Sequence, residues 1–206
     1  MTHHDQTLID RLAGIVKDSP VDRAFRMRAE ARAEVEASYR RLLHPEVPGA
    51  MTLAERRAVA AFVAVLHGEE TTRSHFIDLL RQTEPHLVPL IVAEAEGASY
   101  PGPYGAFPSG PLSAEDLVGP VYRAGPLILQ ATGPRLAAAL DHAHLLALHP
   151  RDASPASLRK LAEAGWTAEG AVLLSQLVSF LGFQIRVVAG LRSFIAARHP
   201  AAASLH

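Results

Sequence analysis

The sequence predicts an all-α fold, and three observations lead to this prediction. Apolar residues recur at helical spacing along almost the whole chain of 206 residues. No run of alternating β-branched residues is long enough to survive as a strand. Hydrophobic residues make up 49% of the chain but aromatic residues only 6%, which favours a bundle of helices packed through alanine and leucine.

Boundary signals divide the N-terminal half into helices. Pro20 opens one helix, and His44-Pro45 ends it. Thr52-Leu53-Ala54-Glu55 is a capping box, in which the Thr52 hydroxyl and the Glu55 carboxylate each bind a free amide of the first turn. Gly68 breaks the helix that follows. We therefore expect helices over residues 8–16, 20–43, 53–66, 70–80 and 89–97.

The C-terminal half follows a loop. Residues 99–112, SYPGPYGAFPSGPL, are too rich in proline and glycine to be helical. Beyond them, Pro134 opens an alanine-rich helix to Leu148, Ser154-Pro155 begin another, and Thr167 begins a long one. We interpret residues 1–206 as a single domain, made of an N-terminal helical half 1–97, a Pro/Gly loop 98–112 and a C-terminal helical half 113–198.

Charge and apolar patterning exclude several classes of partner. The chain has 20 Lys and Arg against 21 Asp and Glu, so it lacks the broad basic field that binds nucleic acid or an anionic membrane. The N-terminus, MTHHDQTLIDRLAG, is polar and acidic rather than signal-like, which predicts a cytoplasmic protein. The most apolar stretch, residues 171–191, is interrupted by polar side chains and is expected to be a buried helix rather than a membrane span.

The absence of cysteine removes thiol chemistry. Without sulfhydryl groups the chain cannot form a disulfide, a thiolate metal site, an iron–sulfur cluster or a thiol nucleophile. We expect neither a cofactor nor a bound metal.

A first group of polar residues surrounds the break at Gly68. Thr71 and His75 are four residues apart on the following helix, with Glu70 one residue earlier, so a hydroxyl, an imidazole and a carboxylate can share one surface. This arrangement suits a proton relay or a weak metal site. The alternative is a solvated helix start, where Glu69 and Glu70 complement the positive end of the helix dipole.

A second group lies near the end of the alanine-rich helix. Asp141 and His144 are three residues apart, whereas His142 and His149 share a different face. Because the set uses two faces, structural zinc is not expected. The interpretation for His149 is that it closes the helix before Pro150.

A third group interrupts the long C-terminal helix. Gln184 and Arg186 stand in a stripe that otherwise predicts core, and Gly182 permits another backbone to approach. A buried guanidinium needs a partner, so we expect Arg186 to be buried and paired, in a helix-packing contact, at a subunit interface or beside a pocket.

Two stretches together resemble the superfamily of AhpD-like alkylhydroperoxidases and carboxymuconolactone decarboxylases, in particular its peroxidase-related branch. Residues 158–169, LRKLAEAGWTAE, are followed by FLGFQIR at 180–186 and by Gly190-Leu191. They are similar to the branch patterns L-R-x-A-G-x-[ST]-x-E, F-N-F-x-N-R and G-L, with Gly182 and Ile185 in place of two asparagines. Residues 53–75 are similar to the helix pair that carries the family's Glu, Cys-x-x-Cys and His.

The redox part of this resemblance is degenerate. With the family histidine placed on His75, the two cysteines fall on Gly68 and Thr71. With the glycine before the first cysteine placed on Gly68, they fall on Glu69 and Thr72, and the histidine falls on Phe76. The family glutamate lies near Glu55, where both registers put an arginine, Arg56 or Arg57. Thiol-dependent peroxidase activity is therefore excluded, because it needs an attacking thiolate and a resolving thiol.

The resemblance implies an AhpD-like helical bundle and a site at the helix pair. The superfamily also includes decarboxylases that use acids, bases and cations without the cysteine pair. On that basis His75 is the candidate acid–base group, Glu69 or Glu70 its carboxylate partner, and Arg73 the cation.

Two functions stay open at this stage. One is a cysteine-independent small-molecule enzyme or binder, with the loop at 100–107 covering its pocket. The other is a non-catalytic subunit that pairs with itself or with a cysteine-bearing sister protein. In both cases we expect a homo-oligomer, because family members assemble through helix faces and the apolar helix surface exceeds what one bundle can bury.

Overall fold

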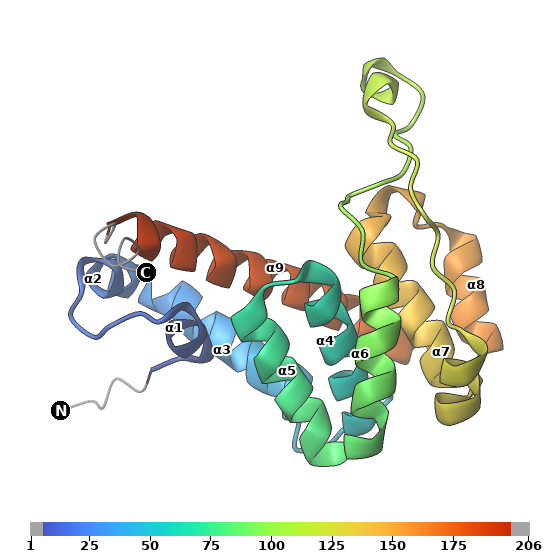
Figure 1. Cartoon of the computed structure of the whole chain (residues 1–206), viewed down its shortest axis with the longest axis horizontal. Coiled ribbons are helices and arrows are strands. Elements are labelled where there is room, and N and C mark those ends of the chain that lie inside the picture. Colours follow the sequence, from blue (N-terminus) through green and yellow to red (C-terminus); the bar gives the residue numbers. More distant parts are fainter. Residues whose placement is uncertain (1–5, 199–206) are drawn as a thin grey trace, which may run out of the picture.

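The computed structural model describes residues 6–198, which contain nine α-helices and no β-strand (Figure 1). Backbone pairing of the β type is limited to one isolated bridge, between Gly105 and Leu117. The prediction of an all-α fold is confirmed.

The first three helices form one end of the molecule (Figure 1). They are α1 (Leu8–Ala13), α2 (Pro20–Arg26) and α3 (Ala29–Leu43). The sequence predicted one continuous helix from Pro20 to Leu43, and this was wrong. The chain leaves the helical conformation at Arg28, where φ is −119° and ψ is 47°, so α2 and α3 point in different directions.

The next three helices carry the expected caps. They are α4 (Leu53–His67), α5 (Glu70–Thr83) and α6 (Val88–Gly97). The capping box at the start of α4 is present: the Thr52 amide donates to Glu55 Oε2 at 2.7 Å, and the Glu55 amide donates to Thr52 Oγ1 at 3.2 Å.

The last three helices are α7 (Pro126–Leu148), α8 (Pro155–Glu163) and α9 (Ala168–Arg198). Helix α7 begins earlier than predicted. It has a kink at Gly133, where φ is 76° and ψ is 171°, and the predicted helix from Pro134 is its second part. Glycine adopts this positive φ without steric cost, and proline fits the first turn that follows.

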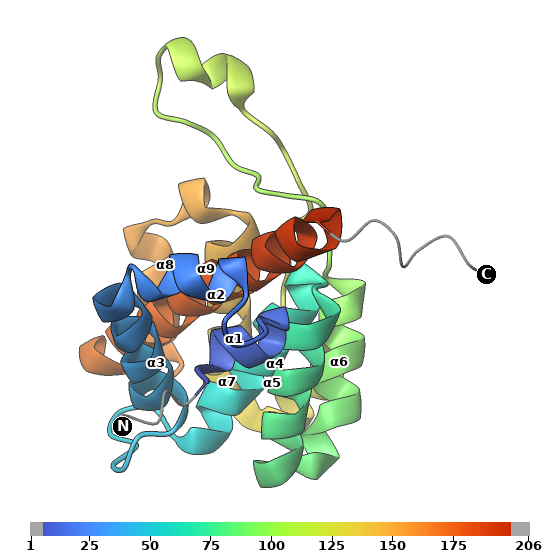
Figure 2. The ribbon, with the colours of Figure 1, turned by 90° about the vertical axis from the view of Figure 1, so that its left-hand side faces the viewer.

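Helix α4 lies at the centre of the bundle. It packs against α5, α6, α7 and α9, and every side chain from Glu55 to Leu66 is buried. Figure 2 shows α4 surrounded by helices from both halves of the chain. The many alanines of α4 let these neighbours approach closely, so the buried residues form one continuous core.

An arm formed by residues 101–121 projects away from the helices (Figures 1 and 2). Its base is held against the end of α7, where the Tyr104 amide donates to the Leu148 carbonyl at 2.7 Å. His149 Nε2 donates to the Pro120 carbonyl at 2.8 Å. The arm is therefore anchored at its base, while its tip extends away from the bundle.

Helix α9 is long and apolar enough, by length and composition alone, to cross a membrane. The same helix packs against α1, α3, α4, α7 and α8. The expectation of a cytoplasmic protein with no membrane partner stays a prediction.

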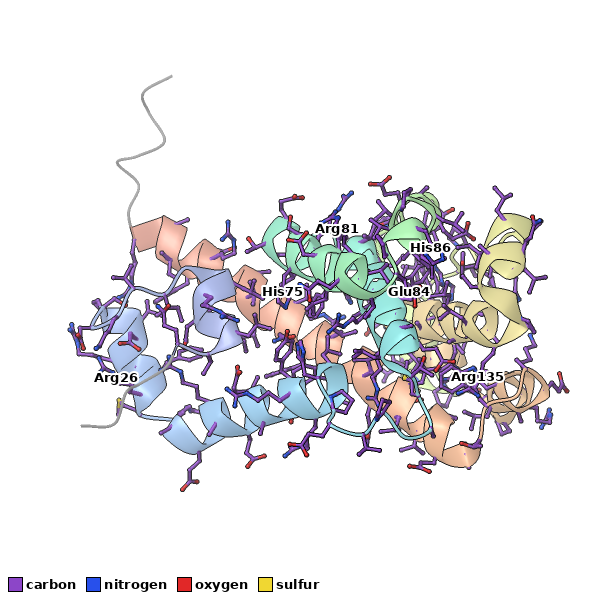
Figure 3. All side chains as sticks on the ribbon, turned by 90° about the horizontal axis from the view of Figure 1, so that it is seen from below. Arg26, His75, Arg81, Glu84, His86 and Arg135 are labelled. Carbon is purple, nitrogen blue, oxygen red and sulfur yellow. The ribbon has the colours of Figure 1, made fainter. Side chains whose placement is uncertain are left out.

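Arg135 of α7 joins three segments at one point (labelled in Figure 3). Its Nε lies 2.6 Å from Glu55 Oε1 of the α4 capping box, and its two terminal nitrogens donate to the carbonyls of Gly165 and Ala50 at 2.6 and 2.8 Å. The guanidinium also stacks on Trp166 at 4.0 Å. This side chain fixes the start of α4 against the start of α9.

Replacing Arg135 by alanine should lower the free energy of unfolding by about 2 kcal/mol, because Glu55 and two carbonyls lose their donor at a site that is only one-third exposed. Arg159→Ala, at an exposed position of α8, is the matched control and should change stability by less than about 0.5 kcal/mol. Urea denaturation followed by circular dichroism measures both. Equal stability of the two variants would contradict this role for Arg135.

Candidate functional site

His75 of α5 lies between helices and is half-buried (labelled in Figure 3). Its Nε2 is 3.0 Å from the Tyr39 hydroxyl of α3, and that hydroxyl is 2.9 Å from His44 Nε2. A phenol has one proton to donate, so one imidazole accepts from Tyr39 and the other donates to it. Burial, with the nearby charge of Arg11, lowers the pKa of His75 from 6.5 to about 4.

The prediction that Glu69 or Glu70 is the carboxylate partner of His75 is wrong. Glu69 caps α5, accepting hydrogen bonds from the amides of Thr71 and Thr72 at 3.3 and 2.7 Å. Its Oε1 also lies 3.3 Å from Arg192 Nε. Burial alone would raise the pKa of Glu69, but the amide hydrogen bonds outweigh it and the pKa is lowered. The free amides at the start of α5 bind the Glu69 carboxylate, so this carboxylate is not available to the His75 imidazole.

The other two predicted residues of the helix pair face outward. Glu70 is exposed and accepts a hydrogen bond from Ser74 Oγ at 3.3 Å. Arg73 pairs with Glu96 at 2.5 Å on the surface. The structure therefore does not bring His75, Glu69, Glu70 and Arg73 together. Glu69 and Glu70 stand at the start of α5, as the alternative interpretation expected, but the side chain of Glu69 is only 12% exposed, so Glu70 alone is solvated.

Arg186 is exposed and has no ion pair among the described residues, so the prediction that it is buried beside a pocket or in a helix contact of the fold is wrong. Its burial at a subunit interface stays a prediction. The buried stripe of α9 runs through Leu181, Ile185 and Val188, and Gln184 belongs to it. Arg186 lies on the far side, because two residues turn a helix by roughly 200°. Burial and the charge of Arg186 lower the pKa of His67.

A cavity of 230 Å³ lies between α7, α8 and the base of the arm, and we call it the α7–α8 pocket. It contains the second group of residues that the sequence singled out. Its polar lining includes Tyr122, Asp141, His142, His144, His149 and Lys160. His75 lines neither this pocket nor the larger cavities described below.

The hydrogen bonds of His142 define its tautomer. Ser175 Oγ of α9 donates to the Ala171 carbonyl at 2.8 Å, so it accepts from His142 Nε2–H at 3.2 Å. His142 Nδ1 then carries the lone pair, and this buried atom has no hydrogen-bond partner in the described chain. Burial lowers the pKa of His142, so the ring is neutral at pH 7.

Two neighbouring histidines have structural contacts. His144 Nε2 donates to the Ala98 carbonyl at 3.1 Å, and burial lowers its pKa. His149 ends α7 as predicted: its Nδ1 lies 3.0 Å from Asp152 Oδ2, and its Nε2 holds the arm. Both nitrogens of His149 are thus in use, whereas His142 keeps one free.

The charged residues of the pocket lining are Arg123, Asp141, Asp152 and Lys160. Asp141 accepts a hydrogen bond from the Ala124 amide at 2.7 Å and lies 3.8 Å from Arg123. Burial raises the pKa of Asp141, against the lowering effect of this hydrogen bond and of Arg123 and Lys160. Tyr122 donates to Glu94 at 3.0 Å, and burial together with that carboxylate raises its pKa. Arg123 and Lys160 are both exposed cations beside a half-buried carboxyl group.

Among residues 6–198 no group of three His, Cys, Asp or Glu side chains is arranged to hold a metal ion. No family model, no curated protein and no solved structure matches the chain. The resemblance to the AhpD-like superfamily stays a prediction.

Sequence reasoning missed the partners of the histidines. Tyr39 and His44 lie on or after α3, far from His75 in sequence, and Ser175 lies on α9, far from His142. The one available signal was that these polar residues interrupt apolar helix faces, as His142 does among the alanines of α7.

The buried state of His75 predicts a pH dependence of stability. The folded protein holds the imidazole neutral down to about pH 4, whereas an unfolded chain takes up the proton near its ordinary pKa of 6.5. Stability should therefore fall as the pH drops from 6.5 toward 4. In His75→Gln, the urea midpoint should fall less between pH 7 and pH 5 than in the parent protein.

His86→Gln is the control for this measurement, because His86 is exposed (labelled in Figure 3). It should keep the pH dependence of the parent. An unchanged pH dependence in His75→Gln would show that His75 is not held neutral by the fold.

Proposed function

We propose that the protein is a cysteine-independent binder of small organic acids that supports proton transfer in the α7–α8 pocket. The observation that carries this proposal is the free Nδ1 of His142, a buried acceptor without a partner. An unsatisfied buried polar atom costs about 1–3 kcal/mol, and each such atom in a native protein needs an explanation, of which a catalytic role is one. The site differs from the helix-pair site expected from the resemblance.

The charges favour a carboxylate ligand. Arg123 and Lys160 are exposed cations in the pocket lining, and Asp141 already accepts a hydrogen bond from the Ala124 amide. Asp152, the other acidic residue of the lining, already binds His149. A cavity of 230 Å³ suits a molecule of a few carbon atoms.

The neutral imidazole of His142 supplies the base. With the ligand's carboxylate near the two cations, Nδ1 removes a proton from the carbon next to a carbonyl group. The resulting enolate is stabilised by the same cations, and the imidazolium then returns a proton to the carbon. No thiol or cofactor takes part in these steps.

Pyruvate is a probe for both binding and chemistry. In D₂O the protein should exchange the methyl protons of pyruvate for deuterium, and His142→Gln should slow this exchange about 100-fold. Lys160→Ala should raise the dissociation constant of pyruvate about fivefold. Proton NMR measures the exchange, and a titration measures the affinity.

The controls are His86→Gln for the exchange and Arg159→Ala for the affinity, because both residues are exposed and neither lines the pocket. Exchange that survives in His142→Gln would remove the assigned base. Failure of pyruvate, acetate and benzoate to bind the parent protein would remove the ligand class.

A second function, self-association as an oligomeric subunit, is favoured by the arm. Its exposed apolar side chains are Leu112, Leu117, Val118 and Val121, and Val118 is 96% exposed. A groove of 1090 Å³ between α3, α8 and α9 offers a complementary surface, with Trp166, Val172 and the cation Arg41 in its lining. The acidic pair Glu115 and Asp116 of the arm carries the charge opposite to that cation. We propose that the arm of one copy docks in the groove of another.

Sedimentation velocity tests the arm contact. The parent protein should sediment as an oligomer at micromolar concentration, and Val118→Asp should shift it to the monomer, because the aspartate places a charge in an apolar contact. Val47→Asp, at another exposed valine, should leave the oligomer intact. A monomeric parent protein would contradict the proposal. The cysteine-bearing sister protein stays an expectation from the resemblance.

A further inference from the structure

A second cavity lies at the opposite end of the molecule from the α7–α8 pocket, where α1, α2, α3 and α9 meet (Figure 1). We call it the Gln184 cavity. Its volume is 390 Å³, and its lining is mostly apolar, with Ile9, Phe25, Val35 and Val187 among the side chains. Neither the proposed organic-acid site nor the arm contact uses these residues.

Gln184 is the unusual member of the lining. Its side chain is fully buried, and neither Oε1 nor Nε2 has a hydrogen-bond partner among the described residues. It stands on the face of α9 that is otherwise apolar, with Leu181 one turn before it and Val188 one turn after it. A leucine at this position would remove two unsatisfied polar atoms, so the amide lowers the stability of the empty protein.

Of the charged residues that line this cavity, Arg32 and Glu36 are already paired, and Arg28 is exposed. Arg32 binds the carboxylates of Asp10 and Asp22. Glu36 accepts hydrogen bonds from the Leu8 amide at 2.9 Å and from Arg40 Nε at 3.2 Å. No buried charge is left to pair with an ionised ligand, so the chemistry of the cavity favours a neutral molecule.

We propose that the Gln184 cavity binds a neutral, largely apolar molecule that carries one carboxamide-like group, an amide or a lactam. The Gln184 amide offers one donor and one acceptor side by side. A carboxamide offers the same pair in reverse order, so two hydrogen bonds form and both buried atoms are satisfied. The apolar remainder of the ligand packs against Ile9, Phe25 and Val187.

Two probes of equal shape separate this proposal from simple apolar binding. Octanamide has the donor and the acceptor, whereas 2-nonanone replaces the amide nitrogen by a methyl group and only accepts. Octanamide should bind the parent protein about tenfold more tightly, since the ketone leaves the Gln184 acceptor unsatisfied. Ligand-observed NMR titration or calorimetry measures both affinities.

Gln184→Leu should abolish this preference, so that the two probes bind with equal affinity. Gln176→Leu is the matched control, an exposed glutamine on the same helix, and it should keep the tenfold preference. Equal binding of the two probes to the parent protein, or a preference that survives in Gln184→Leu, would overturn the proposal.

A second pair of variants tests the location without altering the core. Ala31 is an exposed residue of α3 that lines the cavity, and Ala31→Trp should fill it and weaken octanamide binding at least tenfold. Ala33→Trp, exposed on the same helix and outside the lining, should bind octanamide as the parent does. Unchanged binding in Ala31→Trp, or no binding of octanamide to the parent, would overturn the assignment.

Discussion

The burial of the polar first turn of α4 is the constraint on which the rest of the structure depends. This helix lies at the centre of the bundle, and its charged residues Glu55, Arg56 and Arg57 are buried with its apolar ones. Arg56 donates to the carbonyls of Met51, Leu42 and Pro48 at 2.8 to 2.9 Å. Backbone carbonyls thus replace the water that a guanidinium would otherwise bind, and the segment between α3 and α4 must fold around this side chain.

The filled centre explains where the cavities lie. The centre of the bundle holds completely buried side chains such as Phe62 of α4 and Phe76 of α5. His75 hydrogen-bonds Tyr39 and lines none of the three cavities described above. The two ends of the bundle are packed less completely. Each end holds a cavity with one buried polar atom or group that lacks a partner, His142 Nδ1 in one and the Gln184 amide in the other.

Helix boundaries were predictable where a local hydrogen bond or a proline sets them. The Thr52–Glu55 capping box and the start of α8 at Pro155 depend on residues within one turn of each other. The predicted helix boundaries were wrong where contacts between helices set them. The chain breaks between α2 and α3 although no proline or glycine stands there, while salt bridges of Arg32 to Asp10 and Asp22 join α3 to α1 and α2. Long-range pairs of this kind leave no local pattern.

The sequence by itself determined the helical composition, the caps and the exclusion of thiol chemistry, because these follow from residue types and from contacts within about four positions. Only the tertiary structure decided which polar residues face inward. Gln184 is buried and Arg186 is exposed, although both interrupt the same apolar stretch. Likewise, Glu69 is bound by the amides of its own helix, and His142 is oriented by Ser175 of another. The orientation of a helix about its axis is set by the helices packed around it, so hydrogen-bond partners between helices appear only in the folded chain.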